Sequence, residues 1–295
     1  DRVSSRTTLF RQRDGRPFHG RVSRGPNVVA PSRGWKLRRL RCSSGRSLSH
    51  LDLNIGAGQL FPVCRQVVRL SQESRAVRNA FLPREAPTIP GFELAGGTST
   101  HEEGPGDTLW DHFKLSDGRP GFLVLKATSG ALPAGFYLGL GRSLFRGLAP
   151  EHDQIETLMA SVNRAITLGT PEAPDQDLEC AALVPGAEEL EWCSAGTPPG
   201  GIIGRAGTFQ ELQSQGPPLG MMEGFQYRTS RSPLAMGDCC VTLSHGSSGL
   251  FKGTADLVAG LTGKSAGEVV STVHKAIRQS QGEDSEVSVL FVRRS

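Results

Sequence analysis

Residues 190–199 read Leu-Glu-Trp-Cys-Ser-Ala-Gly-Thr-Pro-Pro and join a short strand pattern to a tight turn. Leu190–Ser194 has the length and the mix of apolar and polar residues that are typical of a strand. Gly196 can adopt a backbone geometry that other residues resist, and the two prolines restrict the chain that follows. Gly216–Gly220, with the sequence Gly-Pro-Pro-Leu-Gly, has the same turn character. This part of the chain is therefore predicted to form a sheet with sharply turned connections.

Strand patterns recur on both sides of this stretch and alternate with helical spacing. The further strand candidates are Phe92–Ala95, Gly121–Leu125, Leu178–Val184, Gly201–Gly204, Phe225–Ser230, Cys239–Leu243 and Val287–Val292. Apolar residues one turn apart predict helices over 133–148 and 155–166, and a third helix begins at a capping box, Ser265–Glu268. Runs of strands with antiparallel helix pairs predict a layered α+β fold, with helices outside two stacked sheets.

Basic residues are concentrated at the start of the chain. Residues 1–50 contain 13 basic residues (Lys or Arg) and 2 acidic residues (Asp or Glu), whereas the remaining residues contain 20 basic and 27 acidic residues. Residues 1–60 also have few aromatic residues, so they are predicted to be a basic, low-order and disordered leader. The alternative is an arm for nucleic acid or an anionic surface. Nucleic acid is the less favoured partner, because few aromatic side chains accompany the arginines.

Residues 61–83 are predicted to form a linker helix. Val63, Val67, Leu70, Ser74, Val77 and Phe81 follow alternating steps of four and three, and Pro83 ends the segment. One interpretation is an amphipathic helix that lies on its own domain. The other is a short coiled coil that would form a homodimer through residues 63–81.

Bulk properties narrow the class of protein. No apolar run approaches the roughly 20 residues that cross a bilayer, so no membrane span is expected. The six cysteines have no zinc-type spacing and fall in core-like positions, which favours a reducing, cytoplasmic location. The sequence leaves open whether residues precede Asp1.

Several short motifs follow one another along the chain. They are Gly106–Asp111, Ser129-Gly130, Ser194–Pro199, Gly216–Gly220 and the terminal strand Val287–Arg294. Their order and spacing over residues 73–294 resemble the SpoIIE/RsbU branch of the PPM-type serine phosphatases. The resemblance implies a four-layer αββα sandwich over residues 84–295. It also implies two Mn²⁺ or Mg²⁺ ions, held by aspartates between the sheets, and a bridging water that attacks a phosphoserine.

This chain departs from the resembled family at positions where that family has metal-binding aspartates. The aspartate before Ser129-Gly130 falls on Ala127, or on Lys126 if the register slips by one residue. The first residue of the terminal Asp-Asp falls on Ser285. Ala127 and Ser285 are therefore lost ligand positions. Two dications close together repel strongly and need several carboxylates around them.

Four residues remain as residual metal-ligand candidates. Asp107 and Asp111 lie in the first motif, where one extra residue separates them, so that only one of them is expected to be in register. His245 replaces the aspartate of a Thr-Asp-Gly motif, and Glu286 precedes the terminal strand. A neutral histidine offsets no metal charge. A site built from this set would hold Mn or Mg, if it holds any metal.

The leading hypothesis is a catalytically impaired SpoIIE/RsbU-like serine/threonine phosphatase, a pseudophosphatase of bacterial signalling. Its partner would be a phosphoprotein or a regulatory protein such as an anti-anti-sigma factor. The first alternative is an active metal-dependent phosphoserine phosphatase, in which Asp111 and Glu286 are the main anionic ligands and His245 replaces an aspartate. The second alternative is binding of nucleic acid or an anionic surface through the basic leader.

Overall fold

The structure is a computed structural model of the 295-residue chain. It describes residues 6–11, 17–22, 35–36, 54–55, 72–99, 106–127, 134–169, 177–196, 200–244, 261, 263–281 and 286–295. The chain divides into two compact units, Asp1–Leu70 and Ser71–Ser295. Among the described helices, none is both long and apolar enough to cross a membrane.

The described residues of the first unit form four short strands in the order β2-β1-β3-β4. They are β1 (Arg6–Arg11), β2 (Pro17–Val22), β3 (Trp35–Lys36) and β4 (Asn54–Ile55). β1 and β2 pair antiparallel with Phe10 opposite Phe18. The description of residues 1–60 as a low-order leader stays a prediction.

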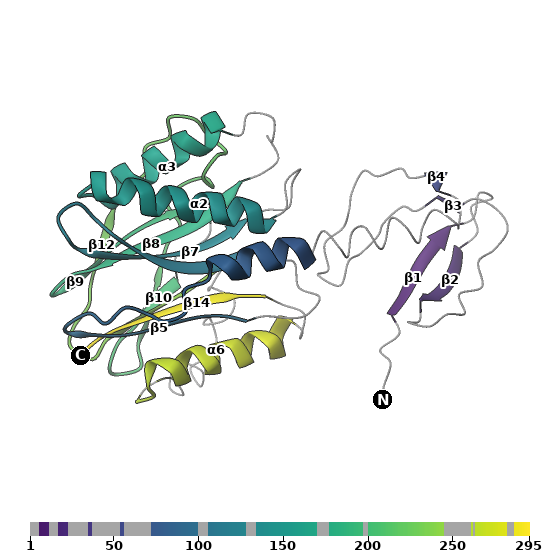
Figure 1. Ribbon diagram of the computed structural model, residues 1–295. Helices are drawn as coiled ribbons and strands as arrows, with labels where there is room; N and C mark the ends of the chain where they lie inside the picture. Colours follow the sequence, from purple (N-terminus) through teal and green to yellow (C-terminus); the bar gives the residue numbers. More distant parts are fainter. Residues whose placement is uncertain are drawn as a thin grey trace. The chain divides into compact units, whose positions relative to one another are not determined.

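The second unit contains two antiparallel five-stranded sheets (Figure 1). In the order β11-β10-β13-β14-β5, the strands of one sheet are Phe209–Leu212, Gly200–Ile203, Cys239–Leu243, Ser288–Arg294 and Phe92–Thr98. In the order β12-β9-β8-β7-β6, the strands of the other are Ser230–Pro233, Glu189–Ala195, Leu178–Pro185, Pro120–Ala127 and Thr108–Lys114. The named helical elements are α2 (Ala134–Leu148), η1 (Ala149–Glu151), α3 (Ile155–Gly169) and α6 (Ala266–Gln281).

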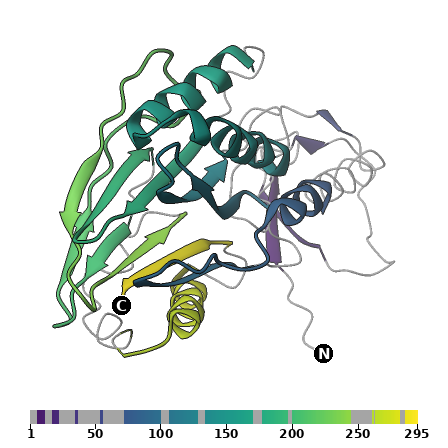
Figure 2. The same cartoon turned by 60° about the vertical axis from the view of Figure 1, so that its left-hand side comes forward.

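The sheets and helices form four layers, as Figures 1 and 2 show. α2 and α3 cover the β6–β9 side of one sheet, and α6 covers β5 and β14 of the other. Side chains such as Trp110, Phe122 and Leu290 fill the space between the sheets. The predicted αββα sandwich is therefore confirmed.

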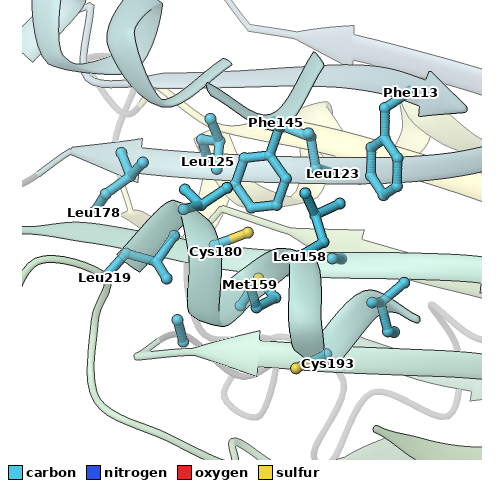
Figure 3. Close-up of a cluster of buried hydrophobic side chains, with 14 of the residues drawn as sticks. Phe113, Leu123, Leu125, Phe145, Leu158, Met159, Leu178, Cys180, Cys193 and Leu219 are labelled. Atoms are coloured by element: carbon cyan, nitrogen blue, oxygen red, sulfur yellow. The ribbon is translucent and has the colours of Figure 1, made fainter. Parts of the chain in front are cut away.

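Alternation along the strands separates the core into layers. In β7, Leu123 and Leu125 face α2 and α3, whereas Phe122 and Val124 face the opposite sheet. Figure 3 shows the helix-side cluster, in which Phe145 packs among leucines from the sheet. This alternation decides which side chains of a strand can reach the space between the sheets.

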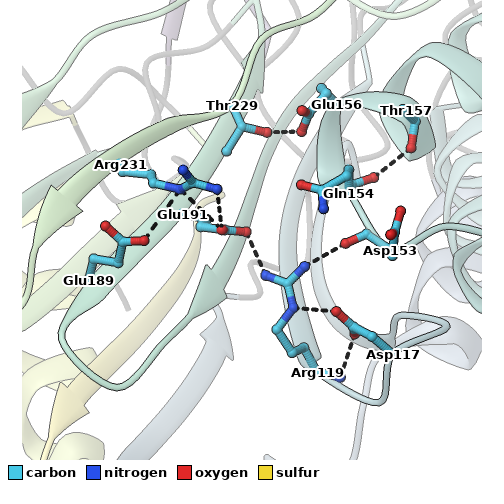
Figure 4. Close-up of polar contacts among 10 residues, drawn as sticks. All are labelled: Asp117, Arg119, Asp153, Gln154, Glu156, Thr157, Glu189, Glu191, Thr229 and Arg231. Atoms are coloured by element: carbon cyan, nitrogen blue, oxygen red, sulfur yellow. Dashed lines mark hydrogen bonds and ion pairs between the residues drawn. The ribbon is translucent and has the colours of Figure 1, made fainter.

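A polar network fastens the start of α3 to the sheet (Figure 4). Arg119 pairs with Asp117 and with Glu191 of β9, and it also donates to the carbonyl of Asp153. Arg231 of β12 donates to the same Glu191 carboxylate at 3.0 Å. These partly exposed pairs are structural contacts, and they lie on the helix-facing side of the sheet, where Glu191 is paired with Val184.

Most predicted elements of the second unit are confirmed, but one predicted strand is wrong, and the strands β6 and β11 were not predicted. Phe225–Ser230 was expected to be a strand, but only Ser230 belongs to one, β12. Phe225 and Tyr227 instead pack edge to face, and the Tyr227 hydroxyl donates to the Pro217 carbonyl, so the segment follows a loop. Thr108–Lys114 is a strand that the sequence analysis treated only as a ligand motif.

The capping box at the start of α6 is present in part. The Glu268 carboxylate accepts from the Ser265 amide at 2.9 Å, and Glu93 of β5 accepts from the Ala266 amide at 2.6 Å. Both contacts satisfy amides that have no partner within the helix. They fix the end of α6 against the sheet.

The helix that precedes the sandwich is described over residues 72–81. Ser74 is buried, and its hydroxyl accepts from the Gly135 amide of α2 at 2.7 Å. Phe81 lies over Gly139 of the same helix. Val77, which the sequence analysis placed in the buried seam, is 39% exposed. The described turns therefore lie on their own domain, and residues 61–71 are outside the described residues.

Candidate functional site

The motifs singled out in the sequence meet at one end of the two sheets. Asp107 immediately precedes β6, Ala127 ends β7, and the Ala127 amide donates to the Asp107 carbonyl at 2.8 Å. Ser244 follows β13, and Glu286 lies two residues before β14. The Ser244 amide donates to the Ser288 carbonyl, which brings these two strand ends together.

Neutral hydroxyl groups connect the two sheets at this end. The Thr108 hydroxyl donates to the Ser288 hydroxyl at 2.5 Å, and the Thr98 and Ser288 hydroxyls lie 2.8 Å apart. Ser288 also donates its amide to the Ser244 hydroxyl at 3.0 Å. Thr108, Ser244 and Ser288 are all buried. These groups satisfy each other's hydrogen-bonding capacity, but they are neutral and supply no negative charge for a metal ion.

Glu286 is held in a buried ion pair. Its Oε1 atom accepts from Nη2 of Arg78, from helix 72–81, at 3.0 Å, and both side chains are completely buried. Its Oε2 atom accepts from the Gly106 amide at 2.6 Å. Both carboxylate oxygens therefore have strong donors from the protein itself.

Asp107 lies near the same arginine and is 2% exposed. Burial lowers the pKa of Arg78, while the charges of Glu286 and Asp107 act in the opposite direction. The structure therefore brings Asp107 and Glu286 together around the Arg78 guanidinium.

A second cation lies at the end of β7. In the strand register, Lys126 lies opposite Thr108, whose side chain faces the other sheet. The Lys126 Nζ atom lies 3.0 Å from the carboxylate of Glu179 in β8. Ala127 instead belongs to the cluster that faces α2 and α3. The residue of this motif that faces the other sheet is thus a lysine.

Asp111 lies apart from Asp107 and Glu286. It is opposite Leu123 on the side of the sheet that faces α2, and it is completely buried. Arg146 donates to both of its oxygens at 2.7 Å, and Nε of Arg142 also lies 2.7 Å from one of them. Next to it, burial lowers the pKa of His112, and the Asp111 charge opposes that shift. The structure gives this carboxylate an ion-pair role.

The described residues do not fit a pair of divalent cations. Glu286 and Asp111 already engage arginines, and they lie in different layers. Within the described ranges, no group of three or more His, Cys, Asp or Glu side chains could hold a metal ion. His245 and Ser285 lie outside the described residues, so the four residual ligands stay predictions.

The cysteines offer no reactive thiolate in the part of the chain that is described. Cys180, Cys193, Cys239 and Cys240 are free and buried. Burial raises the pKa of Cys193 and of Cys240 to about 12. These thiols are therefore protonated near neutral pH, and they act as small core residues.

The sequence profile of the family described as Stage II sporulation protein E (SpoIIE) matches residues 116–295, more than half of the chain. The chain belongs to the SpoIIE family. No curated protein matches this SpoIIE chain.

Solved structures of serine/threonine phosphatases share the fold of the SpoIIE domain. The catalytic domain of the phosphatase PstP, in complex with two manganese ions, has 12% identity and a TM-score of 0.52, over 68% of this chain and 98% of that one. The RsbU and RsbW domains of Rv1364c from Mycobacterium tuberculosis have 19% identity and a TM-score of 0.57, over 70% of this chain and 61% of that one. The PP2C phosphatase domain of SpoIIE from Bacillus subtilis, with a fragment of its regulatory domain, has 13% identity and a TM-score of 0.54, over 80% of this chain and 88% of that one. At these identities the likeness concerns the fold alone.

Sequence reasoning missed Arg78, the residue that organises this end of the SpoIIE domain. It lies four residues after Ser74 and three before Phe81, on the face that the structure buries. Hydrophobicity favoured Val77 for that face. The sequence did contain a signal for Arg78. Ser74, Arg78 and Phe81 are four and three residues apart, a spacing that puts them on one face of a helix.

Proposed function

We propose that this SpoIIE domain is a catalytically impaired serine/threonine phosphatase, a pseudophosphatase that acts in bacterial signalling by binding another protein. One observation carries the proposal: arginine side chains hold Glu286 and Asp111, the two carboxylates that would be the main anionic ligands of an altered metal site. The resident cations are part of the folded chain and do not dissociate.

Electrostatics explains why these contacts disfavour a metal pair. Two like unit charges 4 Å apart repel by about 4 kcal/mol at an intermediate dielectric, and the repulsion is greater for a dication. Arg78 and Lys126 both lie at the sheet end where the metal ions of an intact relative would be expected. Each would have to move before an ion could enter.

The proposed partner is a phosphoprotein or a regulatory protein such as an anti-anti-sigma factor, and the proposed location is the cytoplasm. The RsbU-like frame and the free, buried cysteines support this setting. Pairing of two chains through residues 63–81 is a weaker proposal, because Ser74 and Phe81 already contact α2.

The test combines metal binding with turnover. The complete chain is titrated with MnCl₂ by calorimetry and assayed with an aryl phosphate, and the PstP catalytic domain serves as the active control. We expect no saturable manganese binding and no metal-dependent hydrolysis. A surface-immobilised chain should still capture the anti-anti-sigma protein of the same organism without removing its phosphate.

Turnover close to that of PstP would overturn the proposal. It would favour the altered-ligand enzyme, in which His245 joins Asp111 and Glu286. In that case Glu286→Gln should abolish the activity, whereas Glu189→Gln, in an exposed pair on β9, should leave it intact.

A further inference from the structure

Arg78 connects three segments that are far apart in the sequence. Its helix, 72–81, precedes the sandwich, and its partner Glu286 is 208 residues away, just before β14. Glu286 in turn holds the amide of Gly106, which leads into β6. One carboxylate and one guanidinium therefore join helix 72–81, the turn before β6 and the segment that leads into β14.

Gly106 permits this close approach. Its φ of +64° lies in the left-handed region, and a Cβ at this position would lie 2.8 Å from the Cα atom of Arg75 in helix 72–81. The helix backbone thus packs directly against the turn that carries the Glu286 donor. A glycine at position 106 is therefore required for the close packing of this turn against helix 72–81.

A fully buried arginine requires compensation. The guanidinium stays charged at all ordinary pH values, and burying an uncompensated charge is unfavourable. Here Glu286 contacts it directly, and the buried Asp107 carboxylate contributes favourable charge. The Arg78 guanidinium thus offsets the charge of Glu286 and part of the charge of Asp107 at this end of the sheets.

We propose that Arg78 is the resident cation of this site, so that its guanidinium takes the place of a metal ion and clasps helix 72–81 to the domain. The inference rests on the proposed loss of the metal pair. It goes beyond that loss, because it names the group that compensates the remaining carboxylates. It also implies that a variant without Arg78 is stabilised by one added divalent cation, which would replace the lost positive charge near Asp107 and Glu286.

The main test uses Arg78→Met in the complete chain, which keeps the side-chain length and removes the charge. Thermal unfolding is measured in EDTA and in millimolar MnCl₂, and MnCl₂ binding is measured by calorimetry. The wild-type Tm should be the same in both solutions. The variant should have a lower Tm in EDTA, recover part of it in MnCl₂, and bind one Mn²⁺ per chain. Arg84→Met, at an exposed position after the helix, is the control and should behave as wild type.

A second variant keeps the proposal testable if Arg78→Met does not fold. Arg78→Met combined with Glu286→Gln removes both charges, so it should fold and have a higher Tm in EDTA than either single variant. It should also have lost the response to MnCl₂.

Two results would overturn the inference. One is an Arg78→Met variant with the wild-type Tm, and the other is a destabilised variant that MnCl₂ neither binds nor stabilises. Either result in a chain without turnover leaves the proposed pseudophosphatase in place. Manganese-dependent turnover by the wild type would instead defeat the proposed function.

Discussion

At the scale of single residues, the contacts of the remaining carboxylates determine what this site can do. Asp111 was predicted to be a residual metal ligand from its place in the sequence, and its position on β6 turns it toward α2. Arg142 and Arg146 lie one turn apart on that helix and both reach it. The position of a residue in a motif therefore does not by itself determine which side of the sheet its side chain faces.

Replacing Asp111 tests this ion-pair role. Asp111→Asn leaves two neighbouring arginines without an anion, so we expect a loss of about 1–3 kcal/mol in unfolding free energy; partial exposure of Arg146 keeps the value below that of a fully buried pair. Urea denaturation provides the measurement. Asp117→Asn, in a partly exposed pair with Arg119, should change stability by less than about 0.5 kcal/mol. Equal effects of the two changes would contradict the role.

At the scale of helices and strands, sequence patterns predicted most of the fold. β13 was predicted with its correct ends, Cys239–Leu243, because a mostly apolar run lies between the polar residues Asp238 and Ser244. β6 was missed because its polar residues, Thr108, Asp111 and His112, obscure its alternation. Those residues are stabilised by partners from other elements, which a local pattern does not contain.

The same limit applies to the candidate site. The sequence analysis named Asp107, Asp111, His245 and Glu286 as residual ligands, and that metal-ligand role stays a prediction. The structure places Glu286 beside Gly106, which precedes Asp107, and turns Asp111 toward α2. The partner of Glu286 could not be predicted, since Arg78 is 208 residues away. Contacts between distant segments depend on the complete fold.

The contact between helix 72–81 and α2 depends on Gly135. A Cβ at this position would lie 1.9 Å from the Ser74 carbonyl oxygen, which is backbone and cannot turn aside. Gly135→Ala should therefore cost about 1–3 kcal/mol and loosen helix 72–81. Limited trypsin digestion, with mass spectrometry of cleavage after Arg75 or Arg78, measures the loosening.

Gly147 provides a matched control on the same helix. Nothing lies within 4 Å of a Cβ at Gly147, so Gly147→Ala should stabilise the protein by about 0.5–1 kcal/mol through helix propensity. It should leave the digestion pattern unchanged. Faster cleavage in this control, or none in Gly135→Ala, would show that the contact does not hold the helix.

At the scale of the whole molecule, two partly buried histidines, His112 and His274, make stability depend on pH. Burial is the largest cause that lowers the pKa of His274 in α6 and of His112 in β6, and nearby arginines add to it. Both imidazoles therefore stay neutral in the folded protein at pH values where the unfolded chain takes up protons. Stability should be complete above the unfolded pKa of about 6.5 and fall as the pH drops below it.

Urea denaturation at about pH 7.5 and about pH 5.5 measures this effect. We expect a loss on the order of 1 kcal/mol between the two, and a smaller loss in His274→Gln. Hydrogen bonds from Arg119 lower the pKa of Asp117, and hydrogen bonds from Ser265 lower the pKa of Glu268, so the contributions of these carboxylates are lost only at more acidic pH. Equal or greater stability at the lower pH would contradict the assignment.

The pairing of β14 with β5 has a consequence for synthesis on the ribosome. The last strand lies between β13 and β5 and completes a sheet that includes the first strand of the domain. Helix 72–81 is synthesised 208 residues before its partner Glu286. The nascent chain must therefore carry Arg78 without its partner, and the edge of β5 without its neighbour, until β14 has been made, a state that chaperones commonly protect from aggregation.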